Sequence, residues 1–270
     1  MNSYAEKSKA LTLSDLAAMK RDGEKISCLT AYDASFSTLL DAAGIDVILV
    51  GDSLGMVIQG HQSTLPVTVE DMVYHSRSVA ASRKRAFVVT DMPFASYPAA
   101  EAAIVNAARL MQAGGAQMVK LEGAKLAVIE ALVAQGIPVC GHLGLLPQSV
   151  NQLGGYKVQG RDALQARQIL DDALKIEQAG AGMLVLECVP AALAAEIAER
   201  LIIPVIGIGA GAACDGQVLV LYDMLNISIG NRPRFSKNFM AEGVGGIDEA
   251  VRRYRQAVKS VTFPGPENSY

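Results

Sequence analysis

The chain has 270 residues, of which 51% are hydrophobic and 5% aromatic, and it contains no tryptophan. This length is close to the ~250 residues of a complete α/β barrel and allows one large hydrophobic core. Lysine and arginine total 24 against 27 aspartate and glutamate, a net charge of −3. Because the chain has no basic block to neutralise a phosphate backbone, we expect no nucleic-acid partner.

The N-terminus and the cysteines indicate the cellular compartment. The first ten residues, MNSYAEKSKA, lack the apolar region of a signal peptide, and no apolar run approaches the ~20 residues that span a bilayer. We therefore expect a soluble, cytoplasmic protein without membrane association. The cysteines are far apart, form no CxxC pair and lie in or beside apolar runs, at Cys28, Cys140, Cys188 and Cys214. We expect all four to be small buried hydrophobic residues.

Short apolar runs alternate with helical stretches after an expected N-terminal helix at residues 12–22. The expected strands are residues 26–30, 46–50, 86–90, 118–121, 138–143, 183–186, 204–208 and 217–221. Such alternation implies parallel strands joined by right-handed crossovers, and eight units imply closure into a barrel. The sequence thus predicts an α/β protein, a (β/α)8 TIM barrel with a short N-terminal helix, in a single domain over residues 1–270.

Local signals support most of the crossovers. Asp33 is the expected N-cap of a helix over residues 34–43, and Gly44 and Gly180 are expected to end helices in the left-handed conformation. A further helix is expected over residues 98–113, and another around residues 252–258 closes the barrel. Residues 209–215 are too few for a helix, so either that crossover is degenerate or strand eight is misplaced.

Charged residues stand at the carboxyl ends of the predicted strands, where the loops of an α/β barrel surround one cavity. These residues are Asp52 and Ser53 after strand two, Asp91 after strand three, Lys120 and Glu122 at strand four, and Glu187 after strand six. Carboxylates that follow buried runs such as VILV and MLVL are costly to bury alone. They need a cation or a raised pKa.

A hard metal ion would satisfy several of these carboxylates together. Asp52, Asp91 and Glu122 follow three adjacent strands, and Mg2+ prefers an octahedral shell of oxygen ligands. We therefore expect these three side chains to bind Mg2+, although a single strand-end aspartate is often only a helix N-cap. Lys120 lies two residues before Glu122, so both point into the barrel. Lys120 is expected either to neutralise an oxygen of the substrate or to pair with Glu122.

Glu187 lies two strands away from Glu122, and we expect it to act as a general base with a pKa raised by burial. Ser53 offers a hydroxyl and a backbone N–H to a substrate carboxylate. His142, at the end of strand five, is expected either to support the site or to be an ordinary core histidine. The glycine-rich run 207–211 favours a tight turn over a phosphate loop. Residues 144–161 lack periodicity and predict a functional loop that covers the barrel mouth.

Several long motifs occur together: VGDSLGMVIQGHQSTLPVTVEDM, DMPF, MVKLEG, GIPVCGHLGLLPQSV, GGYKVQGR, LVLECVP and IPVIGIGAG. In these motifs the chain resembles the ketopantoate hydroxymethyltransferase family, from about residue 12 to the C-terminal FPGPENSY. The resemblance implies transfer of a hydroxymethyl group from 5,10-methylenetetrahydrofolate to 3-methyl-2-oxobutanoate, an aldol-type step in pantothenate biosynthesis, toward coenzyme A. The 2-oxo acid would chelate Mg2+ through its carboxylate and keto oxygens, which stabilises the enolate formed at C3.

The resemblance also implies residue roles. Asp52 and Asp91 match the metal-binding aspartates, Glu122 matches a third acidic ligand acting directly or through water, and Glu187 matches the base. The positions that match substrate contacts are Asp52, Ser53, Asp91 and Lys120. No compact signature marks a tetrahydrofolate pocket. Members of the family form homo-oligomers, typically decamers.

Two alternatives remain at the level of sequence. A Mg2+-dependent lyase acting on a 2-oxo or 2-hydroxy acid would use the same carboxylates and stabilise the same enolate. A non-catalytic barrel could bind an oxo acid as a regulator, but Glu187, Lys120 and the expected metal ligands argue against it.

Overall fold

The computed structural model describes residues 9–230, 232–241 and 243–270. The predictions that concern residues 1–8, namely the start of the expected domain and the expected absence of a signal peptide, lie outside the described residues. None of the described helices is both long and apolar enough to cross a membrane.

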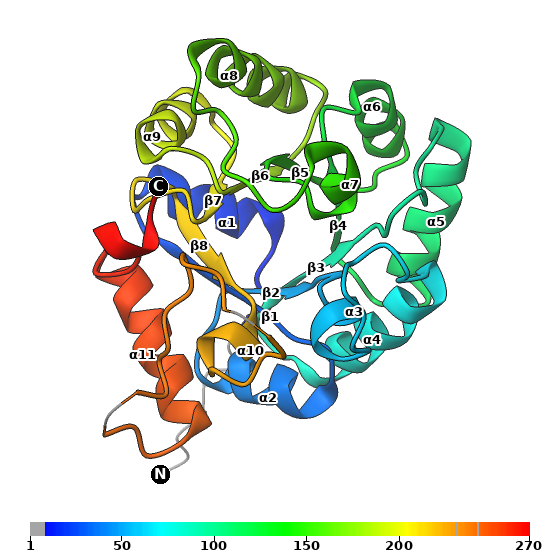
Figure 1. Cartoon of the computed structure of the whole chain (residues 1–270). Coiled ribbons are helices and arrows are strands. Elements are labelled where there is room, and N and C mark those ends of the chain that lie inside the picture. The colour runs from blue at the N-terminus through cyan, green and yellow to red at the C-terminus, as the bar shows by residue number, and fades with distance from the viewer. Residues whose placement is uncertain (1–8, 231, 242) are drawn as a thin grey trace.

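Eight parallel strands form a closed barrel in the order β1 to β8, which confirms the predicted (β/α)8 architecture (Figure 1). The strands are β1 (Ile26–Thr30), β2 (Val47–Val50), β3 (Phe87–Asp91), β4 (Met118–Glu122), β5 (Val139–Gly144), β6 (Met183–Glu187), β7 (Val205–Ile208) and β8 (Gly216–Leu219). Nearly every strand residue is buried, because the outer face of the barrel packs on helices and the inner face fills the centre.

The helices are α1 (Leu13–Arg21), α2 (Ala34–Ala42), α3 (Leu54–Val57), α4 (Val69–Ser82), α5 (Ala100–Gln112), α6 (Leu126–Ala134), α7 (Val150–Leu153), α8 (Ala163–Gln178), α9 (Ala191–Arg200), α10 (Leu221–Met224) and α11 (Ile247–Lys259). Two short 3-10 turns, η1 (Pro147–Ser149) and η2 (Pro266–Asn268), complete the elements. The predicted N-cap of α2 is confirmed, since the Asp33 side chain accepts the Phe36 N–H at 2.9 Å.

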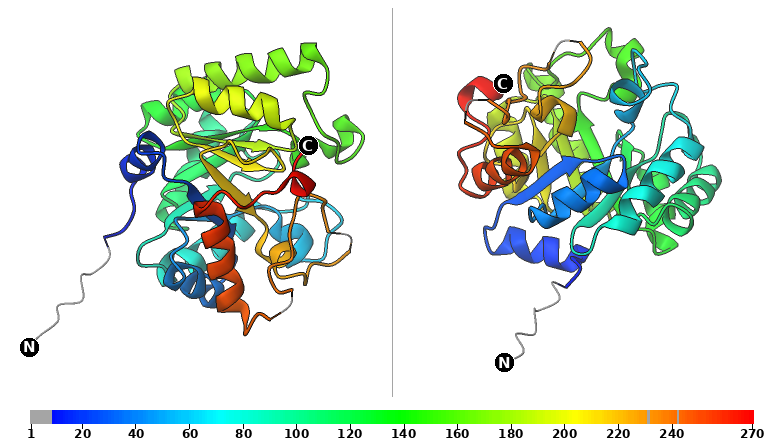
Figure 2. Two further views of the ribbon diagram at one scale, coloured as in Figure 1. Left: turned by 90° about the vertical axis from the view of Figure 1, so that its left-hand side faces the viewer. Right: turned by 90° about the horizontal axis from the view of Figure 1, so that it is seen from below.

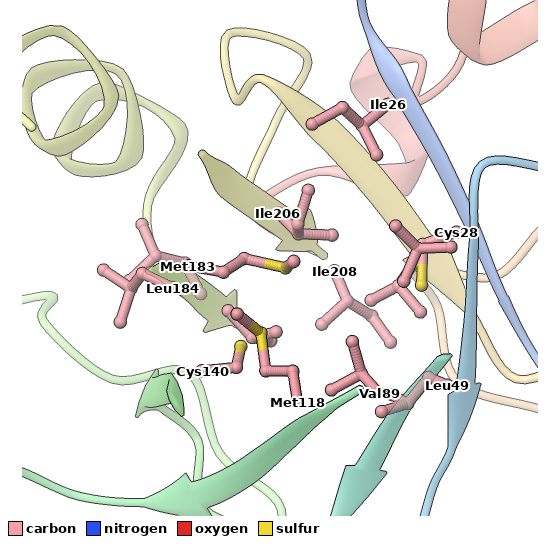
Figure 3. Packing of buried hydrophobic residues seen from close by; sticks show 14 of the residues in the cluster. Ile26, Cys28, Leu49, Val89, Met118, Cys140, Met183, Leu184, Ile206 and Ile208 are labelled. Atoms are coloured by element: carbon pink, nitrogen blue, oxygen red, sulfur yellow. The ribbon is translucent and has the colours of Figure 1, made fainter. Parts of the chain in front are cut away.

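The barrel centre is filled by side chains that alternate along the strands. Figure 3 shows residues from several strands gathered there, including Leu49, Val89, Met118, Cys140 and Met183. Because side chains alternate across a strand, the inward direction of Met118 places Lys120 and Glu122 on the same inner face. All four cysteines are buried and free, as predicted.

Helix α1 closes the end of the barrel at which the strands begin. Its N-cap Thr12 and Asp15 form a reciprocal capping box, and Leu16 is completely buried. The ammonium of Lys20 donates to the carbonyls of Ala198 and Ile203 and pairs with Asp215 at 2.8 Å. Ala198 lies in the last turn of α9, Ile203 precedes β7, and Asp215 precedes β8. The left view of Figure 2 shows α1 at the opposite end from α7, so the other end stays free for a site.

The crossover between β7 and β8 contains no helix, which confirms the degenerate connection. Gly209 and Gly211 have φ of 61° and 83°, so this run is a turn that favours glycine, as predicted. Predicted strand eight extended too far, because Leu221 already begins α10. Helix α11 packs against the barrel beside β1 and β8, where the crossover supplies no helix. There the hydroxyl of Tyr254 lies 2.8 Å from the carbonyl oxygens of Cys28 and Gln217.

Other predicted bounds need small corrections. The helix predicted over residues 98–113 begins later, at Ala100, because the chain is still extended at its N-cap Ala99. The predicted N-terminal helix is confirmed as α1, with Thr12 as its cap and not its first residue. The segment 144–161 is not wholly irregular, because it contains η1 and α7. Local backbone hydrogen bonds order these two elements.

Candidate active site

A cavity of about 520 Å³ lies at the carboxyl ends of the strands. Its lining includes all the residues that the sequence identified as candidates: Asp52, Ser53, Asp91, Lys120, Glu122, His142 and Glu187. Strands β3, β4 and β6 each end one residue later than predicted, so Asp91, Glu122 and Glu187 are their last residues. Their backbones are therefore held in the barrel, and their side chains start from fixed positions.

Lys120 lies on β4 directly beside Asp91 of β3, because the two residues are paired in the strand register. Its ammonium is 2.7 Å from Oδ1 of Asp91, and both side chains are buried. Burial alone would lower the pKa of Lys120, but nearby carboxylates, Asp91 first among them, raise it above its ordinary value. These carboxylates favour the charged form of Lys120, whose ion-pair partner is Asp91 and not Glu122.

Asp52 follows β2 in the turn that leads into α3. Its backbone N–H donates to Oδ2 of Asp91 at 3.0 Å, which joins the loops after β2 and β3. Burial, together with the charge of Asp91, raises the pKa of Asp52 to about 7. The neighbouring Ser53 hydroxyl lies 2.9 Å from the hydroxyl of Tyr32, so this turn is held from the β1 side as well.

Glu122, the last residue of β4, is the third carboxyl group at this end of the cavity. Burial raises its pKa well above the ordinary value, and the charge of Asp52 adds to this effect. Its Oε2 accepts the backbone N–H of Gln148 at 3.0 Å, and its Oε1 lies 3.7 Å from Nδ1 of His142. The carboxylate is therefore oriented from two sides by residues of and after β5.

The donor chemistry at this end of the cavity suits a hard divalent cation. The buried carboxyl groups of Asp52, Asp91 and Glu122 and the partly buried one of Glu187 line the cavity together with the ammonium of Lys120, so added positive charge would stabilise their ionised forms. Within residues 9–230, 232–241 and 243–270, however, no three acidic, histidine or cysteine side chains converge as a ready metal cluster. Lys120 contacts Asp91, and Gln148 contacts Asp52 and Glu122. Three-residue ligation stays a prediction.

Glu187 faces the cavity from β6, two strands away from Glu122 as the sequence predicts. Burial raises its pKa to about 7, and the positive charge of Lys120 only partly offsets this effect. Oε2 of Glu187 lies 3.3 Å from Nε2 of His142. Burial lowers the pKa of His142 well below its ordinary value, so its ring is neutral. A neutral neighbour and a pKa near 7 suit a carboxylate that accepts a proton.

Most of the chain matches one protein family. The family model described as ketopantoate hydroxymethyltransferase matches residues 10–266. The chain belongs to the ketopantoate hydroxymethyltransferase family. The resemblance seen in the motifs is thereby confirmed, and the chain is an enzyme, a transferase.

Relatives named 3-methyl-2-oxobutanoate hydroxymethyltransferase match nearly the full length. The protein of Nitrosococcus oceani is 60% identical over 262 residues, covering 96% of this chain and 99% of the relative. That of Thiobacillus denitrificans is 59% identical, with 96% and 99% coverage. Among solved structures, phosphoenolpyruvate phosphomutase from Streptomyces platensis has a TM-score of 0.60 at 15% identity, covering 80% of this chain and 83% of that one. At this identity, the likeness shows the fold alone.

In this hydroxymethyltransferase, the segment 144–161 contributes to the cavity wall. Leu145, Pro147, Tyr156 and Lys157 all line the cavity, which agrees with the prediction of a loop at the barrel mouth. On the other side of the mouth, the chain after α10 contributes a wall that includes Arg232 and Arg234. The outer cavity thus carries positive charge, whereas the inner end is acidic.

Sequence reasoning missed two buried polar residues of the site, Gln148 and Tyr97. Gln148 donates from its amide to Oδ2 of Asp52 at 2.8 Å, and the Tyr97 hydroxyl donates to the Gln148 amide oxygen. Tyr97 followed no expected strand directly, so no local pattern singled it out. Gln148 does lie directly after a proline in the segment 144–161, which the sequence predicts to be a functional loop. This was the one signal that could have identified it. His142, for which the sequence left two roles open, lies between the carboxyl groups of Glu122 and Glu187.

Proposed function

We propose that the enzyme transfers a hydroxymethyl group from 5,10-methylenetetrahydrofolate to 3-methyl-2-oxobutanoate, giving 2-dehydropantoate for pantothenate biosynthesis. The names of the full-length relatives support the acceptor substrate. The observation that carries the proposal is that the Lys120–Asp91 ion pair and Glu187 line the same buried cavity from different walls. A carbon acid placed between them meets a positive charge on one side and a base on the other.

Asp52 and Asp91 would hold Mg2+, and Glu122 would complete the acidic side directly or through water. When bound, Mg2+ supplies positive charge to the keto and carboxylate oxygens of the 2-oxo acid and thereby acidifies its C3 proton. Oxygen ligands on neighbouring strand ends are the donor type that Mg2+ prefers. Burial, and after it the charge of Asp91, raises the pKa of Asp52 to about 7, and a cation bound beside the two aspartates would offset the repulsion between them.

Lys120 and Ser53 orient the substrate in this proposal. The ammonium of Lys120 remains charged and lies where it can neutralise an oxygen of the 2-oxo acid. The hydroxyl of Ser53 can donate to the substrate carboxylate, and Tyr32 holds that hydroxyl at 2.9 Å. These contacts turn C3 toward the opposite wall, where Glu187 stands.

Glu187 accepts the C3 proton, and C3 then forms a carbon-carbon bond with the one-carbon unit of the folate. Water provides the new hydroxyl oxygen as the two bonds from that carbon to the folate nitrogens break. One nitrogen takes a proton from water and the other takes the proton released by Glu187, so that tetrahydrofolate leaves and the base is restored. Glu187 is suited to the first step because its pKa of about 7 makes it a stronger base than an exposed carboxylate.

The proposal is tested by turnover of 3-methyl-2-oxobutanoate with and without the folate donor. Product formation is expected only with methylenetetrahydrofolate or formaldehyde present, lost in EDTA and restored by added Mg2+. Equal consumption of the oxo acid without a one-carbon donor would instead support the lyase alternative. Activity unaffected by EDTA would contradict the role of the metal.

We also propose that the enzyme is a homo-oligomer, in line with its family, with a decamer as the expected form. Light scattering coupled to size-exclusion chromatography measures the mass in solution. A mass equal to that of the single 28.4 kDa chain at micromolar concentration would contradict this proposal.

A further inference from the structure

Gln148 lies in a connecting segment, yet it makes several polar contacts with residues at the acidic end of the cavity. Its side-chain amide donates to Oδ2 of Asp52 at 2.8 Å and to the carbonyl of Met92 at 2.9 Å. Its backbone N–H donates to Oε2 of Glu122 at 3.0 Å. The residue is buried, and it lies in η1, within the segment 144–161. One residue therefore contacts two of the three carboxylates that we assign to Mg2+.

The orientation of the Gln148 amide follows from its partners. The hydroxyl of Tyr97 accepts the backbone N–H of Glu122 at 3.2 Å, so its own proton is free to go to the amide oxygen of Gln148. The carbonyl of Met92 can only accept, so it must face the amide NH2 group. With the oxygen and one N–H assigned, the other N–H must point to Asp52. A flipped amide would bring its single oxygen, an acceptor, against the two acceptors of Met92 and Asp52.

Taking the metal site of the proposed function as the basis, we propose that Gln148 is a positioning residue. It sets which oxygens of Asp52 and Glu122 face the metal. It holds Oδ2 of Asp52 and Oε2 of Glu122, so Oδ1 and Oε1 are directed elsewhere. Neutral hydrogen-bond donors stabilise both ionised carboxylates without competing as a cation would. Hydrogen-bonding partners behind metal ligands commonly change metal affinity by about 10- to 100-fold.

The same contacts couple the metal to the segment 144–161. Gln148 reaches Asp52 and Glu122 only when η1 is seated over the barrel mouth. If seating the segment prepares the ligands for the metal, then binding the metal must stabilise the seated segment by the same factor. The metal is therefore expected to protect the segment from proteolysis before any substrate is present.

Binding of Mn2+ alone, followed by the electron paramagnetic resonance of the free ion, measures the first effect. In Gln148→Met the side chain keeps a similar length but loses both amide donors and the acceptor, and its Kd for Mn2+ is expected to rise about tenfold or more. Tyr97→Phe keeps the ring and removes only the hydroxyl that orients the amide. Its Kd is expected to rise by a smaller factor, and this variant carries the test if Gln148→Met does not fold.

Gln152→Met is the matched control, because Gln152 lies in α7 of the same segment but is exposed and outside the cavity lining. It should bind Mn2+ as the unmodified chain does. If the unmodified chain binds Mn2+ and both Gln148→Met and Tyr97→Phe match its Kd, the role of Gln148 is overturned while the proposed function stands. If the unmodified chain binds no Mn2+, the metal site of the proposed function fails as well.

Trypsin measures the coupling, since Lys157 and Arg161 are exposed cleavage sites within the segment. Mn2+ is expected to slow cleavage after these two residues in the unmodified chain and in Gln152→Met, but not in Gln148→Met, with fragments identified by mass spectrometry. Equal protection in Gln148→Met would overturn the coupling.

Discussion

Nε2 of His142 lies 3.3 Å from Oε2 of Glu187, while Nδ1 of the same ring lies 3.7 Å from Oε1 of Glu122. The ring thus stands between the carboxylate that we assign as the base and one that we assign to the metal. Because burial lowers the pKa of His142 and favours its neutral form, the ring separates the two carboxyl groups without adding a positive charge beside either. Glu187 therefore remains free to change its protonation state independently of a fixed ion-pair partner.

Replacing Glu187 with glutamine should abolish exchange of the C3 proton while leaving metal binding intact. Glutamine preserves the shape of the side chain but cannot accept a proton, and general-base catalysis commonly contributes about 10²- to 10⁴-fold. Deuterium incorporation into 3-methyl-2-oxobutanoate, followed by NMR with Mg2+ present, measures the exchange. The Kd for Mn2+, measured without substrate, should equal that of the unmodified chain, because Glu187 is not among the expected metal ligands.

Glu130→Gln provides the control for this substitution, because Glu130 is exposed on α6, outside the cavity lining. Its exchange rate should equal that of the unmodified chain. Full exchange activity in Glu187→Gln would assign the base role to another residue.

The exchange rate should depend on pH through the ionisation of Glu187. The pKa of this group is raised to about 7, and only the ionised form accepts a proton. The rate constant should therefore rise with pH below that value and level off above it. NMR exchange rates from pH 5 to pH 9, at saturating Mg2+, measure the profile. A rate that is flat over this range would contradict the assignment of Glu187 as the base.

Asp91→Asn should weaken binding of both the metal and the substrate. Asparagine keeps the size of the side chain but removes the charge that faces Lys120 at 2.7 Å and one expected metal ligand. Since outer partners of metal ligands already change affinity by about 10- to 100-fold, loss of a direct ligand should exceed that range. Calorimetric titration measures the affinities for the metal and the oxo acid.

Breaking one side of a buried ion pair also costs about 3–5 kcal/mol, so the melting temperature of Asp91→Asn should fall. Asp171→Asn is the control, because Asp171 is exposed on α8, away from the cavity. Unchanged metal affinity in Asp91→Asn would remove Asp91 from the ligand set.

Gly144→Ala should disturb both stability and the position of Glu187. Gly144 has φ of 92°, and a β-carbon there would overlap the carbonyl oxygen of Glu187 and approach Val189 Cγ1 at 2.8 Å. Gly136 has a similar φ of 75° with no atom within 4 Å of an added β-carbon. Gly136→Ala should therefore show only the conformational cost, about 1–2 kcal/mol, and normal exchange activity. Gly144→Ala should lose more stability in urea unfolding and exchange C3 protons more slowly. Equal losses in the two variants would mean that the contact with Glu187 is unimportant.

The barrel itself could be predicted from the sequence because its signals are local. Strands buried on both faces must be continuous apolar runs, and the αL glycines Gly44 and Gly180, with φ of 83° and 96°, end their helices as expected. It was also predictable that Asp52, Asp91, Glu122 and Glu187 would line one cavity, because parallel strands bring all their carboxyl ends to one end of a barrel. These inferences need only the order of the elements and the alternation of side chains.

Partners within the site depended on the tertiary structure. Sequence spacing suggested Lys120 and Glu122 as a pair, but the register of β3 on β4 places Asp91 beside Lys120 at hydrogen-bonding distance. The contacts of Gln148 with Asp52 and Glu122 depend on the path of a connecting segment across the barrel mouth. No periodicity encodes such a path, because it is decided by packing between residues that lie 26 and 96 positions apart. The sequence by itself therefore determined which charged groups meet, and only the folded chain decided which atoms they contact.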